Sequence, residues 1–161
     1  MHMDKTKILF VCHGNICRSV MAEYVMKQLC RNAGVGERFE IASAAVSTEE
    51  IGNDIYPPAK RKLKEKGIAF GSHAARRVTR ADYAYDDYIL CADRSNLRWL
   101  NHIIGEDTLG KVSLMMSWAD EDRDVSDPWY TGDFEVAYRD IDLSCRSLLQ
   151  RLTIATKISA S

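Results

Sequence analysis

Short apolar runs alternate along the chain with longer segments in which apolar residues recur every three or four positions. The first run, residues 8–11, is continuously apolar, which is typical of a strand buried on both faces. Apolar residues then recur at helical spacing over residues 22–33, and Gly34 marks the end of that helix. Phe39–Ala45 predicts a second strand, so we expect residues 8–45 to form a right-handed βαβ unit with parallel strands.

The rest of the chain continues this alternation. We expect strands at Tyr88–Cys91 and 111–115, and helices at 57–63, at 97–104 and, as a long C-terminal element, at 134–152. The polar segment 46–56 and the acidic segment 117–133 are expected to be loops. Strands alternating with helices predict an α/β fold with an open sheet. Ligands bind such sheets at the carboxyl ends of the strands, which is where the loop after the first strand lies.

Composition narrows the class of protein further. The 161 residues suffice for one domain, which we place at residues 5–157, with residues 1–4 as a flexible or cloning-derived N-terminus. A net charge of −1 gives no basic field for nucleic acid, and no apolar run is long enough to span a membrane. The five cysteines are odd in number and lie mostly in apolar segments, which favours reduced thiols. We therefore expect a cytoplasmic protein with neither a nucleic-acid nor a membrane partner.

The loop after the first strand combines a cysteine, a glycine, an arginine and a serine in a pattern suited to phosphate chemistry. Gly14 permits unusual backbone dihedrals, and the start of the following helix adds positive potential at the same point. Arg18 offers a planar fork to two oxygens of a tetrahedral dianion. The loop amides, the helix end and the Ser19 hydroxyl should favour the thiolate of Cys12. Cys12 is therefore a candidate nucleophile that would form a phosphocysteine intermediate.

A thiolate displaces an alkoxide or phenoxide readily only if an acid protonates the leaving oxygen. Asp127 is the candidate, because it lies in the loop after the last predicted strand, at the same edge of the sheet as Cys12. Pro128 stiffens this loop and biases Asp127 towards an extended backbone. Trp129 and Tyr130 could form aromatic walls beside an aryl leaving group.

Together these motifs resemble the low-molecular-weight protein tyrosine phosphatase family, over roughly residues 7–152. The resemblance rests on the loop 11–19, on Ser43, on Gly67, Ile68 and His73, on residues 93–96 and on residues 127–130. It implies a single-domain α/β fold with a four-stranded parallel sheet flanked by helices on both faces. It also implies a metal-independent phosphatase without a cofactor. Expected partners are phosphotyrosine-containing proteins, and inorganic phosphate or other tetrahedral oxyanions in the loop.

The resemblance assigns roles residue by residue. Cys12 is then the nucleophile, Arg18 the phosphate clamp and Asp127 the general acid and base. The phosphate-binding loop comprises His13, Gly14, Asn15, Ile16, Cys17 and Ser19; Ser43 and His73 support it; and Glu49, Trp129 and Tyr130 line the substrate cleft.

Four positions bear on how far the resemblance extends. His13 replaces an apolar or small residue beside the phosphate, and Val20 replaces a proline after the Arg-Ser pair, although the loop should still form. Glu49 stands where many eukaryotic members have a tryptophan wall. Ile16 favours phosphotyrosine over phosphoarginine, because relatives acting on phosphoarginine carry threonine there.

Alternatives remain open at this stage. By family precedent Cys17 forms a reversible disulfide with Cys12, or it simply packs. The same fold also hosts thiol-based arsenate reductases, which need a second cysteine pair on a mobile segment, whereas Cys91 is alone on a predicted strand. A noncatalytic phosphate-binding protein is a third hypothesis. A metal site at Cys12, His13 and Cys17 lacks a further ligand pair of suitable spacing.

Overall fold

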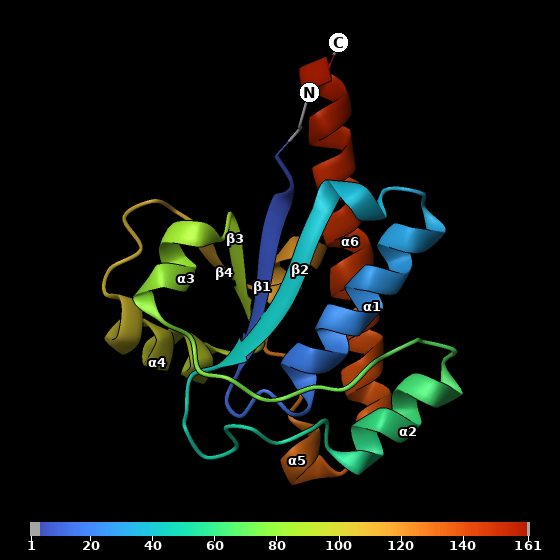
Figure 1. The fold of residues 1–161 in the computed structure, drawn as a ribbon, viewed down its shortest axis with the longest axis vertical. Coiled ribbons are helices and arrows are strands. Elements are labelled where there is room, and N and C mark those ends of the chain that lie inside the picture. Colours follow the sequence, from blue (N-terminus) through green and yellow to red (C-terminus); the bar gives the residue numbers. More distant parts are fainter. Residues whose placement is uncertain (1–3, 161) are drawn as a thin grey trace.

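A four-stranded parallel sheet forms the centre of the fold, in a computed structural model that describes residues 4–160, with side chains described up to residue 154 (Figure 1). The strands are β1 (Thr6–Cys12), β2 (Phe39–Ala45), β3 (Tyr88–Cys91) and β4 (Val112–Leu114). Their order in the sheet is β2-β1-β3-β4, and every neighbouring pair is parallel. The α/β fold class and the four parallel strands are thus confirmed. Residues 1–3 of the expected N-terminal segment lie outside the described residues.

Strand β1 is covered on both faces, which is why its sequence is continuously apolar. Ile8 and Phe10 belong to the core on one face of the sheet, and Leu9 and Val11 belong to the core on the other. All four side chains are fully buried. Because successive side chains of a strand point to opposite faces, each layer of helices receives every second residue.

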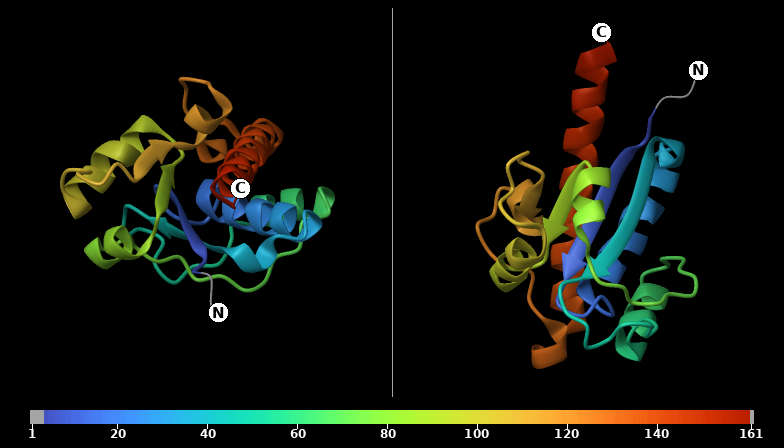
Figure 2. Two further views of the ribbon diagram at one scale, coloured as in Figure 1. Left: turned by 90° about the horizontal axis from the view of Figure 1, so that it is seen from above. Right: turned by 60° about the vertical axis from the view of Figure 1, so that its left-hand side comes forward.

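The helices divide between the two faces of the sheet, as Figure 2 shows in two further views. Helices α1 (Arg18–Asn32), α2 (Pro57–Glu65) and α6 (Phe134–Ala160) enclose the larger core. Helices α3 (Arg80–Tyr85) and α4 (Arg94–Ile104) cover the other face, where Leu100 of α4 packs with Leu9 and Val11. Among residues 4–160, no helix is long and apolar enough to cross a membrane.

The structure contains short helices in segments for which the sequence predicted either a loop or no element. Helix α3 begins with a capping box, in which Thr79 and Asp82 exchange hydrogen bonds with each other's backbone. The acidic segment 117–133 includes part of the 3₁₀ turn η2 (Met115–Ala119) and the four-residue helix α5 (Pro128–Thr131). A third short element, η1 (Gly36–Arg38), precedes β2. Of these elements, α5 matters most for the site because it follows Asp127.

Candidate active site

The loop between β1 and α1 lies at the carboxyl ends of the strands, at the lower end of the view in Figure 1. Backbone hydrogen bonds tie it to the segment after β2. The amide of Val46 donates to the carbonyl of Cys12 (3.1 Å), and the amide of Tyr56 donates to the carbonyl of Ile16 (2.9 Å). The loop is therefore fixed from outside as well as by its own turns. Helix α1 starts directly after it, so the valine at position 20 does not prevent the helix from forming.

Asn15 is the pivot of this loop. Its backbone is left-handed, with a φ of 61°, which is uncommon for a residue other than glycine. Its buried side-chain amide donates to the hydroxyls of Ser19 and Ser43, at 2.9 Å each. Its carbonyl lies 2.7 Å from Nε2 of His73, and its side-chain oxygen accepts from the amide of Arg76 at 3.3 Å. The structure thus brings Ser43 and His73 into contact with the loop through Asn15.

Cys12 is almost fully buried and lines the cavity that the loop surrounds. Its sulfur lies 3.0 Å from the hydroxyl oxygen of Ser19, and the amide of Asn15 donates to the sulfur at 3.3 Å. Helix α1 begins six residues later and directs its N-terminal end at the loop. Hydrogen-bond donors and a helix N-terminus stabilise a negative charge, so this environment suits a thiolate.

Arg18 lies beside this sulfur and is 3% exposed. Its guanidinium donates to Asp93 (2.9 Å) and to Asp127 (3.3 Å), and also to the carbonyl of Val125 (2.9 Å). Burial alone would lower the pKa of this guanidinium, but Cys12 and the two carboxylates outweigh burial and raise it. Arg18 is therefore a permanently charged guanidinium, held in place by three hydrogen-bond acceptors.

Asp127 caps the short helix α5 and reaches towards Arg18 at the same time. One carboxylate oxygen accepts from the amide of Trp129 at 3.1 Å, and the other faces the guanidinium. Its backbone is extended, as Pro128 led us to expect. The carboxylate is therefore held beside the loop by contacts on both of its oxygens.

A cavity of about 480 Å³ joins these groups. The candidates from the sequence that line it are Cys12, His13, Gly14, Ile16, Cys17, Arg18, Glu49, Asp127, Trp129 and Tyr130. Asn15, Ser19 and Ser43 are buried, and they support the loop through hydrogen bonds, whereas His73 contacts it from a partly buried position. The mouth is aromatic on the α5 side, where the Trp129 ring lies 4.8 Å from that of Tyr56.

Several residues of the site have no role in the sequence interpretation. Asp93 belongs to a motif of the resemblance, but its ion pair with Arg18 requires knowing that β3 neighbours β1. Glu23 accepts a 2.5 Å hydrogen bond from the hydroxyl of Ser43 and so completes the network behind Asn15. Glu50 and Trp99 also line the cavity. Glu23 could have been noticed in the sequence as a carboxylate among the apolar positions of its helix. No pattern in the sequence indicated that Trp99 lines the cavity.

Cys17 is the second sulfur at the cavity. Burial raises the pKa of this thiol, and the nearby Cys12 raises it further, so Cys17 stays protonated at neutral pH. All five cysteines are free in the structure. Within residues 4–160, no cluster of three or more histidines, cysteines or carboxylates could hold a metal ion.

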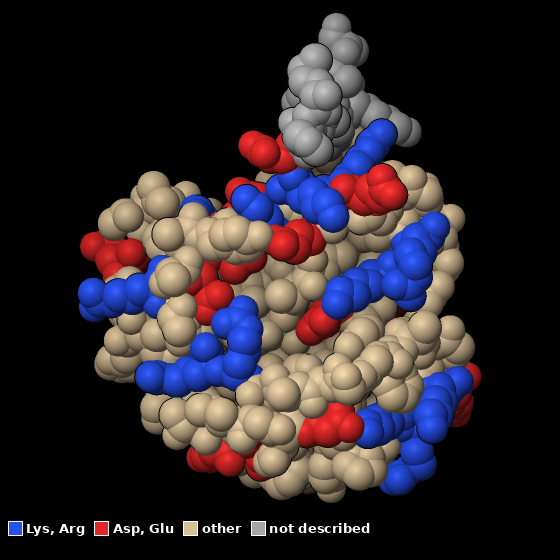
Figure 3. Space-filling model, in the orientation of Figure 1, with Lys and Arg blue, Asp and Glu red and all other residues tan. Residues whose placement is uncertain are grey.

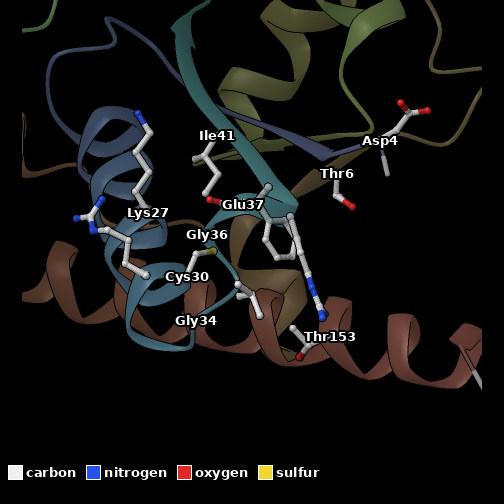
Figure 4. Close-up of a pocket in the computed structure, with 13 residues that line it drawn as sticks. Asp4, Thr6, Lys27, Cys30, Gly34, Gly36, Glu37, Ile41 and Thr153 are labelled. Carbon is white, nitrogen blue, oxygen red and sulfur yellow. The ribbon is translucent and has the colours of Figure 1, made fainter. Parts of the chain in front are cut away.

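A second cavity, of about 870 Å³, lies at the opposite end of the sheet (Figure 4). Thr6 and Ile41 from β1 and β2 line it, together with Cys30 from α1 and Thr153 from α6. Its one sulfur, that of Cys30, belongs to a buried thiol whose pKa is raised to about 11, mainly by burial. This cavity therefore offers no activated nucleophile, and the chemistry concentrates at the carboxyl ends of the strands.

Known proteins resemble the chain over almost its whole length. The sequence model of the family described as low molecular weight phosphotyrosine protein phosphatase matches residues 7–157. The phosphatase of this name from Rattus norvegicus is 40% identical over 149 residues, covering 89% of this chain and 94% of the relative. The low molecular weight protein-tyrosine-phosphatase YfkJ from Bacillus subtilis is 33% identical over 144 residues, covering 88% and 92%.

Solved structures agree with this likeness. The crystal structure of YfkJ superposes with a TM-score of 0.91 at 32% identity, covering 96% of this chain and 99% of that one. An arginine phosphatase from Drosophila superposes with a TM-score of 0.83 at 30% identity, covering 91% and 98%. The shared fold therefore includes proteins named for two different phosphorylated residues.

Proposed function

Because the chain belongs to the low molecular weight phosphotyrosine protein phosphatase family, whose members are phosphoric monoester hydrolases, we propose that it hydrolyses phosphotyrosine at the cavity around Cys12. One observation carries the assignment of roles. The sulfur of Cys12, the guanidinium of Arg18 and the carboxylate of Asp127 converge on one cavity, although Asp127 is more than a hundred residues away in sequence. A nucleophile, an anion clamp and a proton donor are the groups that phosphoryl transfer through cysteine requires.

In the first step the phosphate dianion is held by the loop amides and by Arg18. The Cys12 sulfur attacks phosphorus, so an S–P bond forms while the bond from phosphorus to the tyrosine oxygen breaks. Asp127, in its protonated form, gives its proton to that oxygen, and the product leaves as neutral tyrosine. Arg18 and the loop amides stabilise the charge on the phosphoryl oxygens in the transition state.

In the second step a water molecule attacks the phosphocysteine. Asp127, now a carboxylate, takes a proton from that water; the S–P bond breaks, inorganic phosphate forms and Cys12 returns as a thiolate. The contacts of Arg18 with Asp127 and Asp93 support this cycle, because the guanidinium keeps the acid and the phosphate next to each other. No step needs a metal ion.

Phosphotyrosine is the proposed substrate for two reasons that concern the cavity. Ile16, which by the family resemblance favours phosphotyrosine over phosphoarginine, lines this cavity, and Trp129 and Tyr130 add aromatic surface for an aryl group. Partners are then phosphotyrosine-containing proteins, with inorganic phosphate or a similar oxyanion as a competitive ligand. Five free thiols suit a reducing compartment, so we place the activity in the cytoplasm.

The test is a series of aryl phosphates whose leaving groups differ in basicity, with a phosphoarginine peptide as the comparator for substrate class. Asp127→Ala should slow turnover most for the most basic leaving groups, because these depend most on proton donation. Cys12→Ser should abolish turnover and still bind vanadate, which shows that the variant is folded. A wild-type protein that hydrolyses phosphoarginine faster than phosphotyrosine would contradict the substrate assignment. Residual turnover by Cys12→Ser near the wild-type rate would contradict the mechanism.

A further inference from the structure

Trp99 is a half-exposed indole at the mouth of the catalytic cavity. It belongs to α4, whose buried positions are Asn96 and Leu100. Trp99 itself is 49% exposed, and it lines the same cavity as Cys12. Burying a large aromatic side chain is strongly favourable, so an indole left half exposed at a cavity is available to cover a ligand.

His13 of the phosphate-binding loop contacts this indole. The ring of His13 meets that of Trp99 edge to face, with centroids 6.2 Å apart and planes inclined by 81°. Nε2 of His13 lies 3.0 Å from a carboxylate oxygen of Glu49. The imidazole is therefore held between a carboxylate and an indole, and it connects the position of Trp99 to the loop that carries the nucleophile.

The cavity thus has indoles from two separate elements. Trp129 comes from α5 and rests against Tyr56, while Trp99 comes from α4 and rests against His13. On the His13 side Glu49 offers a carboxylate bonded to the imidazole and no aromatic ring. Trp99 is the aromatic residue that remains for that side.

We propose that Trp99 is a specificity-determining residue, whose indole forms a second aromatic wall for the phenyl ring of the substrate. The inference rests on the proposed phosphatase function. It names the substrate class that the space between Trp99 and Trp129 selects: flat aryl phosphates, in preference to phosphates without a ring. Contacts between aromatic rings of this kind change affinity by about threefold to tenfold. His13 and Glu49 act through Trp99 by holding its support in place.

The experiment compares kcat/KM for para-nitrophenyl phosphate with that for acetyl phosphate, which has a good leaving group and no ring. In Trp99→Ala the ratio of the aryl to the acyl value should fall about threefold to tenfold, through a higher KM for the aryl substrate. Trp99→Phe keeps an aromatic face and should restore most of the ratio. Tyr85→Ala is the matched control, since Tyr85 is 52% exposed and does not line this cavity, and its ratio should equal that of the wild type.

Three results would overturn the inference. The first is an unchanged ratio in Trp99→Ala. The second is an equal loss for both substrates, which would indicate a structural role for the indole. The third is a failure of Trp99→Phe to restore the ratio. A wild-type protein inert towards both substrates would instead refute the proposed function, so the wild-type measurement separates the two failures.

Discussion

Asn15 shows how much of the site depends on one residue. Its left-handed backbone turns the loop, its amide proton reaches the Cys12 sulfur, and its side chain joins Ser19 to Ser43. A glycine could adopt the same backbone without strain, but it would lose the side-chain bonds. Asparagine is favoured because it tolerates the left-handed region better than most residues and also carries two donors.

Asn15→Ala should therefore impair both activity and stability. It leaves buried hydroxyls without a donor and keeps the unfavourable backbone, so we expect a loss of about 2–3 kcal/mol in the free energy of unfolding and at least a tenfold loss in kcat. Urea denaturation and steady-state kinetics measure the two effects.

The matched control is Asp120→Ala. Asp120 is the other described non-glycine residue with a positive φ, at 59°, and it lies in the acidic loop outside the cavity. Asp120→Ala should lower the free energy of unfolding by about 1 kcal/mol or less and leave kcat unchanged. Equal effects of the two substitutions would mean that backbone strain, and not the network of Asn15, determines the phenotype.

At the level of single residues, sequence reasoning indicates the proposed reacting groups but not their neighbours. Cys12 and Arg18 share one loop, so their spacing predicts their chemistry, and Asp127 follows from the need for an acid at the same edge. Asp93 and Trp99 reach the cavity only because β3 lies beside β1 and α4 follows it. That adjacency is a property of strand order, which periodicity does not encode.

Among the structural elements, the segment that carries Asp127 is held in place at several points. Both terminal nitrogens of Arg123 donate to the carboxylate of Asp140 on α6, at 3.0 and 2.8 Å. The amide of Val125 donates to the carbonyl of Ala92 at 2.8 Å, and its own carbonyl accepts from Arg18. The segment that carries Asp127, the proposed general acid, is thus held by contacts with α6 and with Ala92 directly after β3.

Breaking the pair between Arg123 and Asp140 should loosen this segment. Arg123→Met keeps most of the side-chain volume and removes the bidentate pair, so we expect turnover of substrates with basic leaving groups to fall about threefold to tenfold. Substrates with good leaving groups should be affected less. Steady-state rates for a leaving-group series give the comparison.

The control for Arg123→Met is Arg146→Met, on the exposed side of α6. Arg146→Met breaks a single ion pair with Asp142, four residues earlier, at 2.9 Å. Arg146 is also farther from Asp127 in sequence than Arg123 is. Such surface pairs contribute about 0.5 kcal/mol, so kinetics should not change. A leaving-group dependence equal to that of the wild type in Arg123→Met would show that the segment does not need this pair.

The elements predicted best are those with sustained patterns. The strands at Phe39–Ala45 and Tyr88–Cys91 have the predicted bounds, and the C-terminal helix begins at residue 134 as expected. Helix α3 escaped prediction because its six residues carry no apolar period. Its capping box, from Thr79 to Asp82, was the usable signal. Helix α5 has four residues and depends on its cap at Asp127, so propensity alone cannot identify it.

For the whole molecule, charge is spread in small groups of both signs. On the face drawn in Figure 3, lysines and arginines lie beside aspartates and glutamates across the surface. Such a surface is in keeping with the net charge of −1 and makes local environments, not a global field, decide the response to pH. Two carboxyl groups respond in opposite directions.

Glu135 contributes stability that is lost in acid. Its hydrogen bonds with Lys62 and then Lys66 lower the pKa of this carboxyl to about 2. The contribution is therefore present above the ordinary glutamate pKa and disappears as pH falls from about 4.5 towards 2. Glu135 joins α6 to α2 through Lys62, so protonation of this carboxyl weakens that contact.

Asp86 has the opposite effect, because it is a buried carboxyl at the end of α3. Burial raises its pKa to about 6, and the negative charge of Asp82 adds to that effect. Between about pH 4 and 6 the folded protein therefore binds a proton that the unfolded chain releases, so stability falls as pH rises through this window.

Asp86→Asn keeps the shape and removes the charge, and it should raise the free energy of unfolding by about 2 kcal/mol at pH 7.5 and by little at pH 4. Urea unfolding at both values measures the difference, with the exposed Glu106→Gln as a control that should change it by less than about 0.5 kcal/mol. A gain of equal size at both pH values would show that packing of the amide, and not removal of the charge, stabilises the fold.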